Sequence, residues 1–332
     1  MKISSIVDII DGELLNSPSI SFINGIKYDA KTVKTSDLFI AKNFEDLKIA
    51  ISNGAYATIF EENFPIIDNE VAFIKVKNLE LALIKILRYK LSNLKIDAYF
   101  CDNETFDMFE LYQNNHSKNI FLLSEDIEKS FKFIDEVEDG DIIISKNYQI
   151  LNNIYPKNKK FEKYIDENNI KNLVKHSLFE LSFSYEDNYF SRLRLSSLYL
   201  NSFLNIYNFF NKDIDVSKLK FYTNFKAIFI DKNFEPIEFG KSDSFIICQN
   251  NKNLIQAEIK YINDEFKYAK SIFITKNYVE FINKEKQILI KNIDELKNIL
   301  KISNFNCAYL IDFSYKEILE YLQKSQNRPT LF

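Results

Sequence analysis

Glycine and proline are scarce in this sequence, and tryptophan is absent. The 332 residues include 5 glycines, 5 prolines and no tryptophan. Because glycine and proline are the strongest local markers of turns, the boundaries between secondary-structure elements are poorly marked. The scarcity of glycine also disfavours sites in which the backbone approaches a phosphate closely, since that approach favours a residue without a side chain.

Cysteine is rare as well. Cys101, Cys248 and Cys307 are far apart in the chain, and none belongs to a CxxC pair. This spacing argues against a zinc site and against a disulfide framework, and it favours a reducing compartment.

Long apolar runs are missing too. No run approaches the 18 or so apolar residues that a membrane-spanning helix needs. The apolar stretch at the N-terminus is interrupted by Asp8 and Asp11, unlike that of a signal peptide. We therefore expect no membrane span and a cytoplasmic protein. The net charge of -4 provides no basic excess for non-specific binding of nucleic acid.

The composition that remains is typical of a soluble globular protein of two or three domains, with 46% hydrophobic and 27% charged residues. The first ninety residues alternate between periodic apolar stretches and short apolar runs, which predicts an α/β fold. The expected helices are 3–15 (ended or turned by Asp11-Gly12), 44–53 (ended by Gly54) and 79–91. The expected strands are two segments joined by a turn at Asn24-Gly25, then 38–41, 55–60 and 71–76.

The rest of the chain continues this alternation without an internal repeat. Residues 119–147 predict one βαβ unit with Ser124 as the helix N-cap, and the Lys- and Asn-rich residues 157–176 predict a linker or an exposed helix. Beyond them we expect strands at 177–185, 226–231, 244–250, 271–275, 287–291 and 307–312, and helices at 195–210, 292–301 and 314–324.

Five features of residues 3–91 occur in an order that resembles the N-terminal, UDP-binding domain of the Mur ligases. They are "DIIDGELL", Asp29-Ala30-Lys31, the segment Thr35–Ala41 with its Leu-Phe-Ile-Ala strand, Asn53-Gly54-Ala55 before a strand, and Val76-Lys77-Asn78 before a helix. The most similar member is the ligase that adds D-alanyl-D-alanine to a UDP-N-acetylmuramoyl-tripeptide. The resemblance implies a ligand-binding site that includes Asp29, Lys31, Phe39 and Asn78.

The chain departs from the family pattern within this site. Ala30 replaces the family's serine or threonine, and Lys31 replaces its arginine, so a phosphate would meet a point charge without a bidentate fork. The family's loop after the Leu-Phe-Ile-Ala strand is nearly absent, because Lys42 and Asn43 lead almost directly into a helix.

The phosphate-binding loop that a Mur ligase needs is missing from its place. Residues 88–109 contain no glycine and no Gly-Lys-[Ser/Thr] sequence, which cradles ATP phosphates in this family. Gly240-Lys241-Ser242 is the only such tripeptide in the chain. Glu235 replaces the glycine expected five residues earlier, and a strand follows where a helix should begin. We expect a surface turn there.

Other candidate chemistry favours structural roles. His116 and His176 have no partner at metal-ligand spacing, and the pairs Glu61-Glu62 and Glu125-Asp126 are typical of a solvated surface. The aromatic stripe on 195–210 (Tyr199, Phe203, Tyr207 and Phe210) predicts core packing. Lys175 has too little context to be assigned as the family's carbamylated lysine. We expect no metal and no cofactor.

The tail carries a second resemblance to the same ligase. Residues 268–325 follow its order of strand, connection, helix, strand and helix. Asp312-Phe313-Ser314 replaces the family's Lys-Gly-Ser after the last strand and removes a positive charge. The two resemblances together suggest three domains, at 1–95, 96–255 and 256–332.

Three functions remain open. The leading interpretation is a bacterial Mur-ligase-like protein without ATP-dependent catalysis, which binds a UDP-muramoyl peptide or regulates cell-wall synthesis. Its expected partners are that precursor and peptidoglycan-synthesis enzymes. The first alternative is a divergent, active ATP-dependent ligase that forms carbon–nitrogen bonds. The second is a protein-interaction scaffold.

Overall fold

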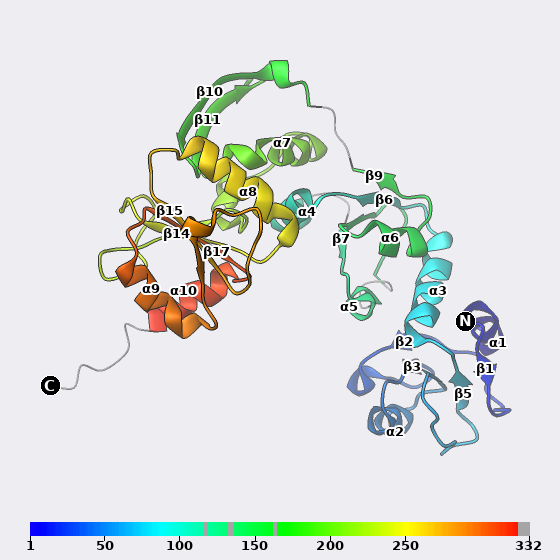
Figure 1. Ribbon diagram of the computed structural model, residues 1–332. Helices are drawn as coiled ribbons and strands as arrows, with labels where there is room; N and C mark the ends of the chain where they lie inside the picture. The colour runs from blue at the N-terminus through cyan, green and yellow to red at the C-terminus, as the bar shows by residue number, and fades with distance from the viewer. Residues whose placement is uncertain (116–118, 132–135, 162–164, 325–332) are drawn as a thin grey trace. The chain divides into compact units, whose positions relative to one another are not determined.

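The computed structural model describes residues 1–115, 119–131, 136–161 and 165–324. The chain divides into two compact units, Met1–Glu162 and Lys163–Phe332 (Figure 1). Both combine helices with sheets that contain parallel strands, so the predicted α/β class is confirmed. The three-domain division stays a prediction. None of the described helices is long and apolar enough to cross a membrane.

The first unit contains two sheets. The first has the order β1-β5-β4-β3-β2, with β1 antiparallel and the others parallel. The second is parallel, with the order β7-β8-β6-β9. The strands of the first unit are β1 Glu13–Leu14, β2 Ile26–Lys27, β3 Leu38–Ile40, β4 Ala57–Phe60, β5 Ala72–Lys75, β6 Asp97–Phe100, β7 Ile120–Leu123, β8 Ile142–Ser145 and β9 Lys159–Lys160. The α-helices of this unit are α1 Ile3–Ile10, α2 Phe44–Ser52, α3 Leu79–Ser92, α4 Asn103–Tyr112, α5 Ile127–Phe131 and α6 Tyr148–Ile154.

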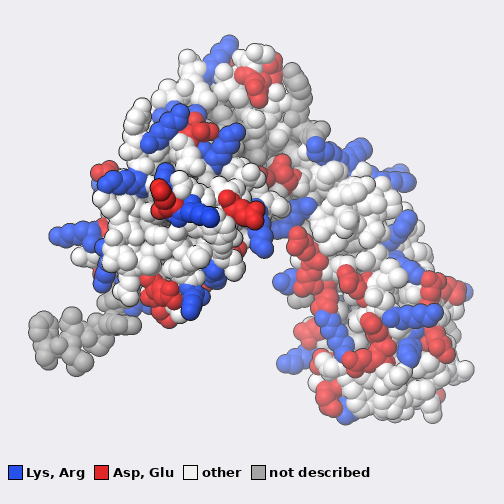
Figure 2. All heavy atoms as spheres, in the orientation of Figure 1, with Lys and Arg blue, Asp and Glu red and all other residues white. Residues whose placement is uncertain are grey.

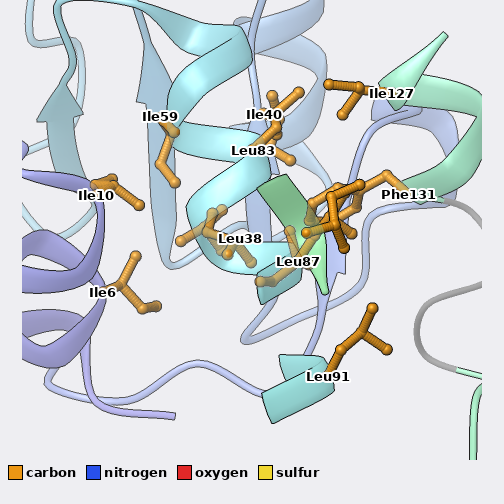
Figure 3. Packing of buried hydrophobic residues seen from close by; sticks show 14 of the residues in the cluster. Ile6, Ile10, Leu38, Ile40, Ile59, Leu83, Leu87, Leu91, Ile127 and Phe131 are labelled. Atoms are coloured by element: carbon orange, nitrogen blue, oxygen red, sulfur yellow. The ribbon is translucent and has the colours of Figure 1, made fainter. Parts of the chain in front are cut away.

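Helix α3 belongs to the cores of both sheets. It packs against α1 on one side and against α5 and α6 on the other. Figure 3 shows Leu83 and Leu87 of α3 between Ile6 of α1 and Phe131 of α5. These residues belong to one continuous apolar cluster, so the first unit has a shared core.

The second unit also contains two sheets. The antiparallel sheet β10-β11-β12 packs against α7, and the other sheet has the order β13-β14-β17-β15-β16, with only β13 antiparallel. Its strands are β10 Ile170–Ser177, β11 Glu180–Tyr185, β12 Asn188–Leu193, β13 Ala227–Phe229, β14 Phe245–Gln249, β15 Ser271–Thr275, β16 Gln287–Leu289 and β17 Cys307–Ile311; its helices are α7 Leu200–Phe209, α8 Lys252–Glu265, α9 Leu296–Ile302 and α10 Tyr315–Lys324.

Helices cover both faces of the larger sheet in this unit. The side chains of α9 and α10 join one apolar cluster with β14, β15 and β17. On the opposite face, the buried Glu258 of α8 accepts hydrogen bonds from Gln249 Nε2 of β14 at 2.8 Å, from Tyr309 Oη of β17 at 2.5 Å, and from the hydroxyl of Tyr199. The carboxylate thus has donors from three other elements, as a buried charge requires.

The aromatic stripe of α7 lies in the core, as predicted. Phe203 has no exposed surface, and its ring lies 5.7 Å from that of Phe190 on β12. Tyr207 lies 5.3 Å from the same ring. These side chains therefore join helix to sheet and offer no stacking platform.

Several sequence-based boundaries are wrong. The first helix ends at Ile10, at the expected Asp11-Gly12 stop, where Asp11 takes a left-handed φ of 51°. The extension to residue 15 is wrong, because Glu13–Leu14 pairs with β5. A side chain at Gly12 would approach Ile74 to 2.8 Å, so the chain passes close to that strand. Of the two strands expected around Asn24-Gly25, the second is β2, whereas the segment before the turn contributes only an isolated bridge between Phe22 and Lys2.

Two further local predictions need correction. The described part of the expected linker or helix, residues 157–161 and 165–176, contains β9, a single 3-10 turn at Glu167–Asn169 and most of β10. The N-cap of α5 is Asp126 and not Ser124. Asp126 Oδ1 accepts a hydrogen bond from the backbone N–H of Glu128, while Ser124 accepts one from Asp126 in the preceding turn.

Helix α3 offers a matched test of the shared core. Leu83 is 2% exposed and Leu81 is 51% exposed on the same helix. Leu83→Ala should lower the free energy of unfolding by about 2–5 kcal/mol, because it leaves a cavity. Leu81→Ala should change it by less than about 0.5 kcal/mol. Denaturant titrations followed by circular dichroism compare the two variants. An equal loss of unfolding free energy in the two variants would contradict the assignment of Leu83 to the shared core.

Candidate functional site

The predicted ligand-binding residues are distributed around the carboxyl edge of the first sheet. Asp29 and Lys31 follow β2 in a short 3-10 turn, Ala30–Thr32. Asn78 follows β5 at the start of α3. Because the carboxyl ends of parallel strands form one edge of a sheet, these three residues share that edge. Phe39 lies within β3.

The turn that carries Lys31 is held in place by hydrogen bonds. Asp29 Oδ1 accepts one from the backbone N–H of Lys31 at 3.0 Å. Asn53, at the end of α2, donates from Nδ2 to the carbonyl oxygen of Ala30 at 2.9 Å. The Lys31 side chain is exposed and forms no ion pair with any described residue. Its charge is therefore accessible to a ligand.

The N-terminus of α3 is occupied by the chain's own side chains. Asn78 Oδ1 accepts a hydrogen bond from the backbone N–H of Leu81 at 2.7 Å, and Glu61 Oε2 accepts one from that of Leu79 at 2.9 Å. Free N–H groups at a helix N-terminus attract anions. Here a carboxylate already holds one of these positions, so a phosphate would have to displace it.

Phe39 does not belong to the accessible part of the site. Its side chain is 1% exposed and packs in an apolar cluster with Leu47 and Ala50 of α2. The Phe39 side chain packs against α2, and it has almost no exposed surface that a ligand could contact. We therefore remove Phe39 from the candidate site.

A cavity of about 660 Å³ lies at the same edge. Its described lining comprises six carboxylate residues, Lys42 and the apolar residues Ala41, Leu79, Leu83 and Ile127; the acidic residues are Glu61, Glu62, Glu80, Glu125, Asp126 and Glu128. Figure 2 shows acidic side chains interleaved with lysines over the visible face of this unit. The fold thus gathers in one cavity the two carboxylate pairs, Glu61-Glu62 and Glu125-Asp126, that were expected on a solvated surface.

Lys42 offsets only one of the six acidic side chains of this cavity, Glu128. Its ammonium group pairs with Glu128 and lies 5.3 Å from the centre of the Tyr28 ring. The carboxylate of Glu128 raises the pKa of Lys42, and burial raises the pKa of Tyr28 to about 12. Lys42 stays charged but already has its counter-ion, so the cavity favours a cationic group of a ligand.

The place of the family's phosphate-binding loop is filled by a tight turn. Only Cys101 and Asp102 separate β6 from α4, and the Asp102 carboxylate accepts a hydrogen bond from the backbone N–H of Thr105 at 2.7 Å. Burial raises the pKa of Glu104 in the first turn of α4, and the charge of Asp102 adds to the rise. An ATP phosphate would meet acidic side chains here in place of a glycine-lined cradle.

The second possible phosphate loop is the predicted surface turn. Gly240 has a left-handed φ of 72°, Lys241 is exposed, and β14 begins at Phe245. The segment thus joins two strands and opens no helix, which confirms the prediction. The geometry of a phosphate-binding loop is absent there.

Two of the remaining candidates, His176 and Lys175, already have polar partners in the structure. His176 Nε2 lies 2.7 Å from the hydroxyl oxygen of Ser182 on the neighbouring strand, and Lys175 pairs with Glu265 at 2.6 Å. His116 lies outside the described residues. Within the described residues, no group of three His, Cys, Asp or Glu side chains could hold a metal ion.

Comparison with known proteins gives a likeness in structure only. No family model and no curated protein matches the sequence. The MurF ligase from Thermotoga maritima in complex with ADP aligns over 91% of this chain and 97% of its own, with a TM-score of 0.55 and 13% identity. The chain has the fold of the Mur ligases.

Other solved structures agree with this fold. MurF from Acinetobacter baumannii aligns over 98% of both chains, with a TM-score of 0.55 and 10% identity. A UDP-N-acetylmuramoylalanyl-D-glutamyl-2,6-diaminopimelate–D-alanyl-D-alanyl ligase from the same organism covers 98% of this chain and 97% of its own, with a TM-score of 0.52 and 11% identity. The Mur ligase resemblance is thus confirmed for the fold.

The two phosphate-loop positions predict how the chain responds to ATP. Calorimetry with Mg-ATP should give no binding heat, and a phosphate-release assay should give no turnover. Lys241→Ala should leave stability unchanged, because Lys241 is an exposed turn residue. If the chain releases phosphate from ATP and Lys241→Ala abolishes that release, the conclusion that neither turn binds ATP phosphates is contradicted.

Proposed function

We propose that this protein is a Mur-ligase-like, non-catalytic protein of peptidoglycan-precursor metabolism, which binds a UDP-muramoyl peptide. The turn between β6 and α4 carries the proposal. A strand and a helix occupy the place of the ATP centre, but two residues join them and Asp102 caps the helix. ATP-dependent ligation needs bound phosphates, and this turn offers acidic groups in their place.

The carboxyl edge of the first sheet suggests how such a ligand would lie. Lys31 is an accessible cation there, so we place the diphosphate beside it. The acidic cavity would repel a diphosphate but suits an ammonium group. One neighbour in fold is named for a substrate with a diaminopimelate residue. A peptide of that kind carries an ammonium group, which we place near Glu125 and Asp126.

A regulatory role in cell-wall synthesis would follow from binding without turnover. The protein would then act in the cytoplasm, on precursors shared with active peptidoglycan-synthesis enzymes. Its three cysteines are buried and free, as suits a reducing compartment.

Titration of the full chain with UDP and with a UDP-muramoyl tripeptide tests the proposal. Lys31→Ala should weaken binding of both ligands by about ten- to a hundredfold, because it removes a charge-assisted contact to the diphosphate. Lys95→Ala is the matched control, since Lys95 is exposed at the opposite, amino end of β6. The double variant Glu125→Gln, Asp126→Asn should weaken binding of the tripeptide and spare UDP.

Each outcome decides one part of the proposal. No heat with either ligand at millimolar concentration would overturn the binding function. Equal losses for Lys31→Ala and Lys95→Ala would remove the diphosphate from the carboxyl edge. Unchanged tripeptide binding in the double variant would remove the peptide from the acidic cavity.

A further inference from the structure

The second unit contains a cavity of the opposite charge. It has a volume of about 340 Å³, within the size range of ligand pockets of roughly 300–1,000 Å³. Its walls come from the segment after β12, from the 3-10 helix Val216–Phe221, from β13 and from α10. Its described lining includes Arg194, Lys220 and Lys226 and no Asp or Glu. Because no acidic residue of the described lining balances these positive charges, the cavity favours a ligand with a negative charge.

Aromatic rings hold each of these cations at the wall. The guanidinium carbon of Arg194 lies 4.6 Å from the centre of the Phe239 ring, and Lys226 Nζ lies 4.7 Å from that of Tyr315. Lys220 Nζ lies 5.0 Å from the ring of Phe221. A ring attracts a cation through its quadrupole but does not neutralise the charge. The cations remain free to bind an anion.

Arg194 and Lys226 have no acidic partner in the described chain. Neither forms an ion pair or a side-chain hydrogen bond with another described residue. Burial lowers the pKa of Lys226, and repulsion by the Arg194 charge lowers it further. The fold thus holds two uncompensated cations near each other, which costs stability until an anion binds between them.

The backbone next to Lys226 is strained. Phe225 has a φ of 54°, a left-handed conformation that bulky residues rarely adopt, and its ring is buried in the cavity wall. Strained residues of this kind are concentrated at ligand-binding positions. Phe229 of β13 also lines the cavity, so aromatic side chains contribute to the wall beside the cations.

We propose that this cavity binds a small aromatic anion, with the anionic group between Arg194 and Lys226 and the ring against Phe225 and Phe229. The ligand class follows from the lining, which supplies positive charge at one part and aromatic surface at another. The site uses none of the residues assigned to the UDP-muramoyl peptide, so either proposal can fail without the other.

Calorimetric titration of the full chain with phenyl phosphate and with benzoate tests the proposal. At least one should bind about tenfold more tightly than either of two controls. Inorganic phosphate carries the charge without the ring, and benzyl alcohol carries the ring without the charge. Failure of both aryl anions to bind would overturn the proposal. Equal affinity for inorganic phosphate would overturn the aromatic part.

Variants locate the site. Arg194→Gln and Lys226→Met should each weaken binding of the aryl anion at least tenfold. Lys226→Arg keeps the charge and should retain binding, which separates a lost contact from a lost fold. The control is Lys301→Met, at an exposed lysine on α9 outside the cavity lining. Unchanged affinity in folded Arg194→Gln and Lys226→Met would place the ligand elsewhere.

Discussion

Hydrogen bonds from helix N-termini to Asn and Asp side chains are the interaction on which both units depend. Asn43 caps α2, Asp102 caps α4, Asn147 caps α6 and Asn251 caps α8. With 5 glycines in 332 residues, the chain cannot build long glycine-rich connections between strands and helices. A capping side chain closes a short turn and accepts a hydrogen bond from a backbone N–H group that would otherwise have no partner in the helix. Each cap adds about 1 kcal/mol to the stability of the fold.

The same caps determine how the protein can bind anions. At α3 and α4 the chain's own side chains accept hydrogen bonds from backbone N–H groups that could otherwise bind a phosphate. Positive charge for a ligand must therefore come from side chains. In the two proposed sites, Lys31 would supply it in the first unit and Arg194 and Lys226 in the second. Binding there would rest on side-chain charge and not on a backbone cradle of N–H groups.

The sequence predicted the regular elements well where periodicity and burial coincide. The helices at 44–53 and 79–91 and the strand at 38–41 lie within two residues of their observed bounds. Asp11-Gly12 marked the end of α1, but the two-residue strand Glu13–Leu14 is too short to carry an alternation signal and was missed. The exposed strand β10 was missed because alternation needs one buried face. The acidic cavity was missed because its carboxylates, from Glu61 to Glu128, are far apart in sequence and only the fold brings them together.

The exposed strand β10 has a consequence for behaviour in solution. It lies at the edge of its sheet, and seven of its eight residues are exposed. Such an edge can recruit strands from other molecules and start aggregation. Two irregularities in its pairing with β11, a left-handed Asn172 and the charges of Lys171 and Lys175 interrupt the regular row of backbone groups. These features disfavour the pairing of β10 with strands of other molecules.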